Sequence, residues 1–147
     1  MNHDEVVTEI RLALGDRLLD LQQRSAKRLY LTVDPDVIPD TARLLGNDLK
    51  ARIQTATGAD GPREMEILYH WALDSSGLVI SVRTRIDRDQ PQIASISSIC
   101  PAATWIEREM WELLGISFTG HPDLRHLVLQ DDWPEGKYPL RRDYQRE

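Results

Sequence analysis

Residues 64–86 read EMEILYHWALDSSGLVISVRTRI, and this stretch decides the fold. Two runs of alternating apolar and polar residues flank the sequence Asp-Ser-Ser-Gly at 74–77, which is typical of a hairpin turn. Such alternation places every second side chain on one face of a half-buried antiparallel strand. The residues predicted to share the buried face are Met65, Ile67, Tyr69, Trp71, Leu73, Leu78, Ile80, Val82 and Ile86.

The chain before this hairpin shows both helical and strand patterns. Apolar residues recur at helical spacing in residues 4–14 and again in residues 38–49. Residues 28–33 alternate as a strand does, and residues 52–57 predict a further strand. A turn is expected over residues 58–62, ahead of the hairpin.

The chain after the hairpin changes character at Gly115. Residues 92–99 predict a weaker strand, and residues 101–114 predict a helix that ends at this glycine. Residues 116–147 are rich in Pro, Gly, Asp and Arg and show little periodicity. We therefore predict an α+β domain over residues 1–115, an antiparallel β-sheet covered by helices, followed by an extended irregular C-terminal arm over 116–147. The residues predicted to form the apolar side of the last helix are Ala102, Ile106, Met110 and Leu113.

The composition excludes several classes of protein. The formal net charge of −6 argues against a nucleic-acid partner and against direct docking on anionic lipid. No run approaches the roughly 20 apolar residues that span a bilayer, so membrane association is expected only through other proteins. Cys100 is the only cysteine in the sequence. A single thiol cannot supply the four ligands that an iron–sulfur cluster normally takes, so no such cofactor is expected in this chain.

Residues 101–144, PAATWIEREMWELLGISFTGHPDLRHLVLQDDWPEGKYPLRRDY, carry a specific motif. Glu-Arg-Glu at 107–109 is followed by Glu-Leu-Leu at 112–114 and by Gly-His-Pro-Asp-Leu-Arg at 120–125, with an apolar pair at 127–128. In this combination the segment resembles the 30 kDa subunit family of respiratory-chain NADH dehydrogenases. The resemblance implies an accessory subunit that scaffolds a catalytic chain and has no catalytic, cofactor or metal site of its own.

The segment also departs from the usual family pattern. Thr104 and Ile106 stand where the family often has Asn and Tyr, and residues 133–144 read WPEGKYPLRRDY in place of the usual WEGHPLRKDY. These departures and the short N-terminal half resemble the form found in energy-converting [NiFe]-hydrogenase and formate hydrogenlyase-type complexes. An NADH or ferredoxin:quinone dehydrogenase remains the other interpretation.

The resemblance implies which other proteins this chain contacts. The expected partners are a large 49 kDa or [NiFe]-hydrogenase-like subunit and a small cluster-bearing subunit, so iron–sulfur clusters and a NiFe centre would lie in those chains. The complex would place this chain in the cytoplasm, on the cytoplasmic side of the membrane. The residues predicted to bind the partner are Glu107, Arg108, Glu109, Glu112, His121, Arg125, Trp133, Arg141 and Arg142.

The charge cluster of the last helix needs a physical explanation. Arg108 and Glu112 can pair along the helix, but such a pair contributes only about 0.2–0.5 kcal/mol. We therefore expect the glutamates to form a buried or interfacial network with Arg141 or Arg142, because a guanidinium can meet a carboxylate with two hydrogen bonds. A solvated helix face is the simpler alternative for any charge cluster.

Two other functions remain open from the sequence. Clustered carboxylates could serve a small enzyme as acid and base, although three glutamates on one helix do not by themselves separate two pKa values. The chain could also be a stand-alone protein-interaction module. A metal site at His121 and His126 is not predicted, because both histidines lie beyond the glycine stop and form no Glu-x-x-His pair.

Overall fold

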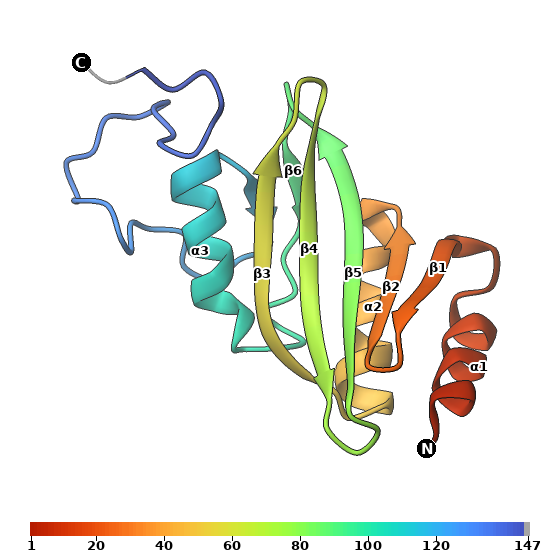
Figure 1. The fold of residues 1–147 in the computed structure, drawn as a ribbon. Helices are drawn as coiled ribbons and strands as arrows, with labels where there is room; N and C mark the ends of the chain where they lie inside the picture. The colour runs from red at the N-terminus through yellow and green to blue at the C-terminus, as the bar shows by residue number, and fades with distance from the viewer. Residues whose placement is uncertain (146–147) are drawn as a thin grey trace.

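The computed structural model describes residues 1–145, and its centre is a five-stranded sheet with strand order β1-β2-β5-β4-β3 (Figure 1). All neighbouring strands are antiparallel except β2 and β5, which run parallel. The predicted hairpin is confirmed, because β4 and β5 pair without a register shift and every residue assigned to its shared face is buried. The strands are β1 (Leu18–Ser25), β2 (Arg28–Val33), β3 (Arg52–Asp60), β4 (Glu64–Leu73) and β5 (Leu78–Asp87).

The two predicted N-terminal helices are also present. Helix α1 (His3–Leu14) begins after Asn2, whose side-chain oxygen accepts a 2.9 Å hydrogen bond from the Glu5 N–H. Such a cap satisfies one of the free N–H groups of the first turn. Helix α2 (Ile38–Ala42) continues into a π-helical turn, η3 (Arg43–Asp48), so together they cover the predicted helical stretch.

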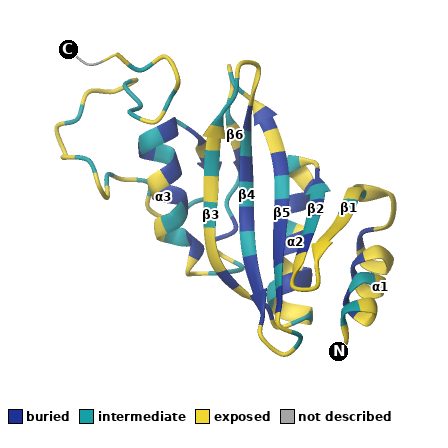
Figure 2. Cartoon of the chain, viewed as in Figure 1, coloured by how far each residue is buried: buried dark blue, intermediate teal, exposed yellow. Residues whose placement is uncertain are grey.

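The elements form layers around one core. Helix α2 and a small parallel sheet of β6 (Gln92–Ala94) and β7 (Ser117–Thr119) lie behind the large sheet in Figure 1, and α3 (Ala103–Leu114) lies at the β3 edge. The buried residues of the sheet face these elements (Figure 2). On its opposite face, no helix or strand of residues 1–145 covers the sheet. The predicted α+β class is confirmed, with one sheet face left open.

Three of the strands that precede α3 differ from the prediction. Strand β1 was not predicted, because it lies at the sheet edge and most of its side chains are exposed. Strand β3 continues through Gly58 to Asp60, so the turn starts later than expected. Strand β6 ends at Ala94 instead of residue 99, because the Ile96 N–H donates to the Glu107 carboxylate in place of a neighbouring strand.

The buried side of α3 is not the one predicted. Its inward positions are 103, 107, 110 and 114, and the second of these is a glutamate that is fully buried. Of the predicted apolar side, Met110 is buried and Ile106 packs against the core while partly buried, whereas Ala102 is exposed and Leu113 is only partly buried. Because one of the four inward positions is a hydrogen-bonded glutamate, the spacing of apolar residues alone does not reveal the buried side of the helix.

The irregular C-terminal segment starts four residues later than predicted. Ile116 is fully buried and residues 117–119 form β7, so these residues belong to the folded domain. We call residues 120–145 the arm; they form no helix or strand. The last two residues of the predicted 116–147 segment lie outside the described part of the chain. Figure 1 shows the arm curving around α3.

Gly115 lets the chain leave α3 and the arm return to it. Its φ of +77° is in the left-handed region, and a Cβ there would lie 2.6 Å from Tyr138 Cε2 and 2.7 Å from an Arg141 nitrogen. Gly120 has a similar φ of +81°, but a Cβ there would meet nothing within 4 Å. The two glycines therefore share the backbone constraint and differ only in the approach of the arm.

This difference predicts unequal effects of two alanine substitutions. Both Gly115→Ala and Gly120→Ala should cost about 1–2 kcal/mol for the left-handed backbone. Gly115→Ala should additionally displace Tyr138 and Arg141, so the amide of Leu140, which donates to the Leu113 carbonyl, should exchange faster in this variant alone. Thermal unfolding with hydrogen exchange measures both effects. Equal exchange at Leu140 in the two variants would contradict the packing argument.

Candidate partner-binding site

Arg108 holds the first part of the arm through its backbone. The side chain is buried on α3, and its Nε donates to the Arg125 carbonyl at 3.0 Å while an Nη donates to the His126 carbonyl at 2.7 Å. A planar guanidinium is suited to such paired contacts because its donors have a fixed geometry. Arg108 therefore fixes two consecutive peptide groups of the arm against the helix.

Glu112 holds the next three residues from one helical turn further on. Its carboxylate accepts hydrogen bonds from the N–H groups of Leu127, Val128 and Leu129, at 3.0, 2.7 and 3.2 Å for the shortest contact of each. It also lies 3.2 Å from His126 Nδ1. Burial alone would raise the pKa of the Glu112 carboxyl, but the three backbone donors outweigh burial and lower the pKa below its ordinary value. The side chain is therefore ionised at pH 7 and binds the arm as an anion.

Glu107 performs a similar task on the other side of α3. It accepts from the Ser95 hydroxyl at 2.6 Å and from the Ile96 N–H at 3.0 Å, which fixes the segment that follows β6. Burial raises the pKa of the Glu107 carboxyl above its ordinary value, although these two hydrogen bonds oppose the effect. Burial also raises the pKa of Tyr69, whose hydroxyl has no hydrogen-bond partner among the described residues.

His121 fixes the turn that starts the arm. Its Nε2 lies 2.9 Å from the Thr104 carbonyl, and its Nδ1 accepts from the Asp123 N–H at 3.0 Å. A neutral imidazole that carries its proton on Nε2 satisfies both contacts, an assignment made from the two partners. The side chain is buried, 3.9 Å from Glu107. His121 therefore has a structural role in this chain, at the start of the arm.

The far end of the arm returns to the end of α3 and to the β3–β4 turn. The Leu140 N–H donates to the Leu113 carbonyl, and Arg141 Nε donates to the Leu114 carbonyl at 2.7 Å. These bonds satisfy carbonyls at the helix end that have no partner within the helix. Arg141 also lies over the Tyr138 ring, 4.7 Å from its centre.

Asp60 and Arg88 bind the last described turn, and neither residue was predicted from the sequence. Arg88 meets the Asp60 carboxylate with two hydrogen bonds of 2.7 and 2.9 Å and lies 3.3 Å from the Asp143 carboxylate. Asp60 also accepts from the Arg142 N–H at 2.9 Å, and its hydrogen bonds with Arg88 lower its pKa. These residues are far apart in the chain, so no local pattern could have predicted their contact.

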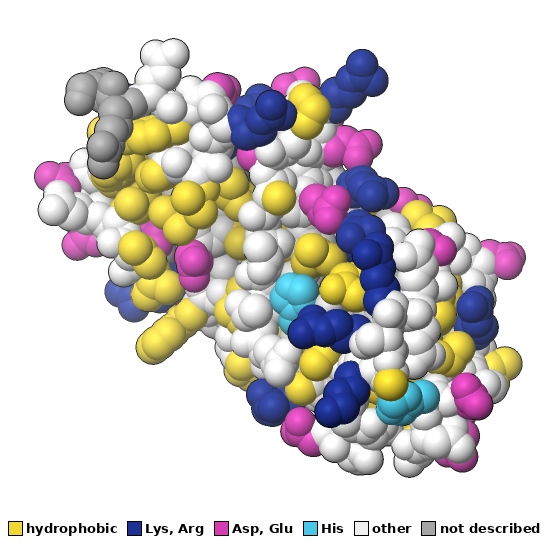
Figure 3. Space-filling model, viewed as in Figure 1, with side chains coloured by type: hydrophobic (Ala, Val, Ile, Leu, Met, Phe, Trp, Pro, Cys, Tyr) yellow, Lys and Arg dark blue, Asp and Glu magenta, His cyan; other side chains and the backbone are white. Residues whose placement is uncertain are grey.

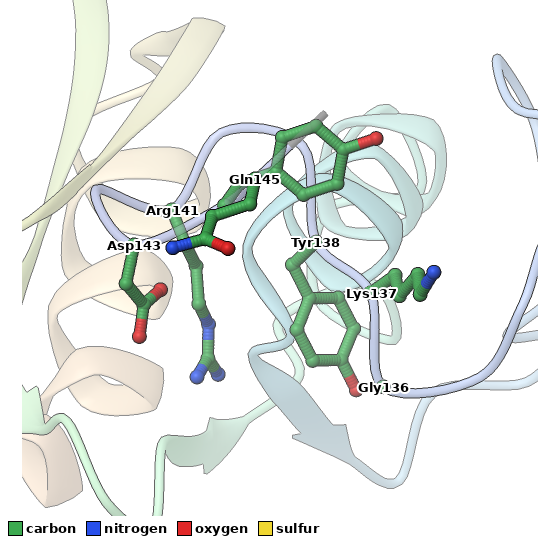
Figure 4. Close-up of a pocket in the computed structure, with 7 residues that line it drawn as sticks. Gly136, Lys137, Tyr138, Arg141, Asp143 and Gln145 are labelled. Atoms are coloured by element: carbon green, nitrogen blue, oxygen red, sulfur yellow. The ribbon is translucent and has the colours of Figure 1, made fainter. Parts of the chain in front are cut away.

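The arm also folds back on itself. Trp133 Nε1 donates to the Lys137 carbonyl at 2.7 Å, and its ring lies near that of Tyr144. Seven of the residues between 136 and 145 line a cavity of about 430 Å³ (Figure 4). A second cavity of about 290 Å³ lies between Trp111 and Trp133. The arm thus keeps a shape of its own and has a recess on its α3 side.

The structure brings most of the predicted site residues together, but in a different pairing. The expected hydrogen bonds of the helix glutamates with Arg141 or Arg142 were wrong, because Glu107 and Glu112 bind backbone N–H groups instead. Arg108 and Glu112, whose spacing would let them pair along the helix, both contact the arm instead. Backbone groups are present at every residue, so no sequence pattern distinguishes them as partners.

Three of the predicted residues remain exposed, and Arg142 is one of them. Glu109 points outward from α3, next to its buried neighbours, and Arg125 lies 2.9 Å from Asp123 at the surface. Glu109 lines a cavity of about 230 Å³ together with residues of β3 and Leu140, and His121 is not part of it. This arrangement does not support the acid–base pair that an enzyme would need. In residues 1–145, no group of three or more His, Cys, Asp or Glu side chains is arranged to hold a metal ion.

Helix α3 thus binds the irregular arm through buried charged side chains. A profile described as "Respiratory-chain NADH dehydrogenase, 30 Kd subunit" matches residues 31–147, which include the sheet, α3 and the arm. This chain belongs to the 30 kDa subunit family of respiratory-chain NADH dehydrogenases. The family predicted from the motif is therefore confirmed.

The 30 kDa family members that resemble this chain come from several kinds of complex. One subunit of the F(420)H(2) dehydrogenase of Methanosarcina mazei is 38% identical over 121 residues, covering 80% of this chain and 76% of the relative. The corresponding subunit of the NADH-quinone oxidoreductase of a Roseiflexus species is 32% identical, covering 97% and 84%. Hydrogenase-4 component G of Escherichia coli is 30% identical and covers 95% of this chain but only 26% of that protein.

Solved structures show the same fold. A chain of the membrane-bound sulfane sulfur reductase, an archaeal respiratory membrane complex, matches with a TM-score of 0.85 at 27% identity, covering 97% of this chain and 85% of that one. A trypsin-resistant fragment of Nqo5 matches with a TM-score of 0.68 at 21% identity, covering 82% and 98%, and supports the fold alone.

Replacing Glu112 tests whether its charge holds the arm. Glu112→Gln removes the anion that accepts from residues 127–129 and should cost about 1.5–3 kcal/mol of local stability, because hydrogen bonds to charged groups contribute that much. The amides of Leu127, Val128 and Leu129 should then exchange at least about tenfold faster, as measured by hydrogen exchange. Glu109→Gln is the matched control on the same helix, since Glu109 is exposed. Similar protection in both variants would contradict this role.

Glu107 should make the stability of the domain depend on pH. Its folded-state pKa is raised above 4.5, so its contribution to stability is full below that value and is lost as the pH rises through the folded pKa. Glu107→Gln cannot ionise and should remove this contribution. Urea unfolding of both proteins across a pH series should show the difference in free energy of unfolding, wild type minus variant, falling as the pH rises. A constant difference would disprove the assignment.

Proposed function

We propose that this chain is a non-catalytic accessory subunit of a complex I-like membrane-bound oxidoreductase, and that α3 and the arm bind the large catalytic subunit. The observation that carries this proposal is the apolar surface on these two segments. Of the seven large apolar side chains that are most exposed in residues 1–145, four belong to α3 or the arm. They are Trp105, Leu127, Val128 and Leu140.

Several peptide groups of the arm are already hydrogen-bonded within the chain. Arg108, Glu112 and Leu113 bind peptide groups of the arm, so its exposed side chains are held outward at fixed positions. Figure 3 shows apolar side chains gathered over the part of the molecule formed by α3 and the arm. Exposed apolar patches of this kind mark interaction surfaces, and a pre-ordered segment loses less entropy on binding.

The relatives support the class of complex without selecting a branch. Components of an F(420)H(2) dehydrogenase, of NADH-quinone oxidoreductases and of hydrogenase-4 all match this chain. We retain the energy-converting hydrogenase as the preferred complex and the NADH or ferredoxin:quinone dehydrogenase as its alternative. In either case the proposal places iron–sulfur clusters, and NiFe in the hydrogenase branch, in partner chains.

The proposal also places this chain at the periphery of the complex. No helix within the described residues is long and apolar enough to span a membrane. In this proposal, other proteins of the complex connect this chain to the membrane-embedded subunits, and the chain lies on the cytoplasmic side.

Co-purification of the tagged chain from membranes of its source tests the proposal. We expect it to retain a large subunit related to the 49 kDa or [NiFe]-hydrogenase chain, identified by mass spectrometry. Replacing Trp105 and Val128 together by serine should reduce the retained large subunit at least about tenfold, because truncating a central apolar anchor costs more than 1 kcal/mol at many interfaces. Thermal unfolding should remain close to that of the wild type, since both side chains are exposed.

The matched control replaces two equally exposed residues elsewhere. Leu12 on α1 and Leu19 on β1 are 75% and 57% exposed, against 68% and 65% for Trp105 and Val128. Leu12→Ser with Leu19→Ser should leave the amount of retained large subunit unchanged. Equal losses in both double variants, or no such subunit with the wild type, would refute the proposed docking surface.

A further inference from the structure

The open face of the five-stranded sheet is a second surface without a described function. Outward side chains of β2, β4 and β5 alternate with the buried ones, and no element of residues 1–145 lies over them. Figure 3 shows a band of Lys and Arg side chains along this face, with a histidine beside it. The band is unexpected in a chain with a net charge of −6.

The strand register places three arginines in this band. Arg83 and Arg85 are alternate residues of β5, so both point to the open face. Arg28 of β2 pairs with Val79 of β5 and continues the band at the other end of the strand pair. Arg28 and Arg85 are exposed, and Arg83 is partly buried.

One carboxylate within the band is shared by two of these arginines. Glu66 lies 2.9 Å from Arg83 and 3.6 Å from Arg85. A single negative charge between two guanidinium groups leaves positive charge unmatched at the centre of the sheet. The other acidic residues on outward positions lie toward the strand ends: Asp20, Glu64 and Asp87.

The floor between the arginines is neutral and partly buried. Tyr30, Leu68 and His70 occupy neighbouring strands here, and the Arg24 guanidinium lies 5.0 Å from the centre of the Tyr30 ring. His70 Nδ1 lies 2.8 Å from the Ser81 hydroxyl oxygen. Burial, with the charge of Arg28, lowers the pKa of His70, so this ring adds no positive charge at pH 7.

We propose that this open sheet face binds an extended acidic segment of another protein, with carboxylates at every second position. Arg83 and Arg85 are two residues apart on one strand, a separation of roughly 6.6–6.8 Å. Side chains at alternate positions of an extended peptide repeat at the same distance, so two of its carboxylates can meet both guanidiniums. Arginine favours such contacts because it can bind a carboxylate through two hydrogen bonds. The proposal goes beyond docking of the arm and uses a different surface.

Zero-length cross-linking on native membranes tests the occupant directly. Arg28→Lys and Arg85→Lys keep the positive charge and supply amines that a carbodiimide can join to carboxylates in contact with them. We expect each lysine to cross-link to Asp or Glu of another protein, with the cross-linked acids at alternate positions of one segment. Cross-links confined to Glu66 and other residues of this chain, or none at all, would overturn the proposal.

Charge reversal measures how much the arginines contribute to this contact. Arg85→Glu combined with Arg28→Lys should reduce the cross-links from position 28 at least about tenfold, which corresponds to a loss of about 1.4 kcal/mol in binding. Arg43→Glu with Arg28→Lys is the matched control, because Arg43 and Arg85 are 54% and 50% exposed and each lies near one carboxylate. The control should leave the cross-links unchanged. Equal losses in both, or a lower melting temperature in Arg85→Glu alone, would remove the support for a specific contact.

Two further experiments test whether another polyanion, a lipid surface or RNA, binds this face instead. Sedimentation with vesicles of phosphatidylcholine and phosphatidylglycerol tests a lipid surface, and nuclease treatment of the membranes tests RNA. Charge-dependent binding to the vesicles, or loss of the lysine cross-links after nuclease treatment, would replace the acidic protein segment by that polyanion. Failure of the Trp105 and Val128 test would leave this result unaffected, since the two surfaces share no residue.

Discussion

The arrangement of the C-terminal third depends on a buried carboxylate that accepts three backbone N–H groups. Glu112 lies on α3 beneath an arm that has no helix or strand of its own, so its anion does for residues 127–129 what a neighbouring strand would otherwise do. A buried charge is costly unless it is hydrogen-bonded, and here the arm supplies those bonds. Helix and arm therefore depend on each other: Arg108 and Glu112 supply hydrogen-bond partners to the peptide groups of the arm, and the arm in turn covers both side chains.

Glu107 extends the same principle to the opposite side of the helix. It binds the segment after β6, while His121 links the start of the arm to the Thr104 carbonyl. One helix thus fixes two irregular segments by hydrogen bonds to their peptide groups. The sheet provides a rigid support for this helix, and the apolar residues between them form one core.

Local sequence patterns predicted the regular elements of the fold. Elements and contacts that have no such pattern were missed. The β4–β5 hairpin, α1 and the glycine end of α3 follow from local patterns, and the family followed from the motif in α3 and the arm. The edge strand β1 was missed because it is mostly exposed, and the buried side of α3 because Glu107 interrupts its apolar period. The contact of Asp60 with Arg88 joins distant residues, and the backbone partners of Glu112 have no residue type to recognise.

The way the arm is held has an evolutionary consequence. Arg108 and Glu112 bind peptide carbonyls and amides, which every amino acid except proline supplies in full. The path of residues 125–129 is therefore held largely through their backbone, although the His126 side chain also contacts Glu112 and lies near the Trp111 ring. Mutations there can change the chemistry presented to a neighbour while the chain keeps its course, so one scaffold can be adapted to catalytic partners with different surfaces.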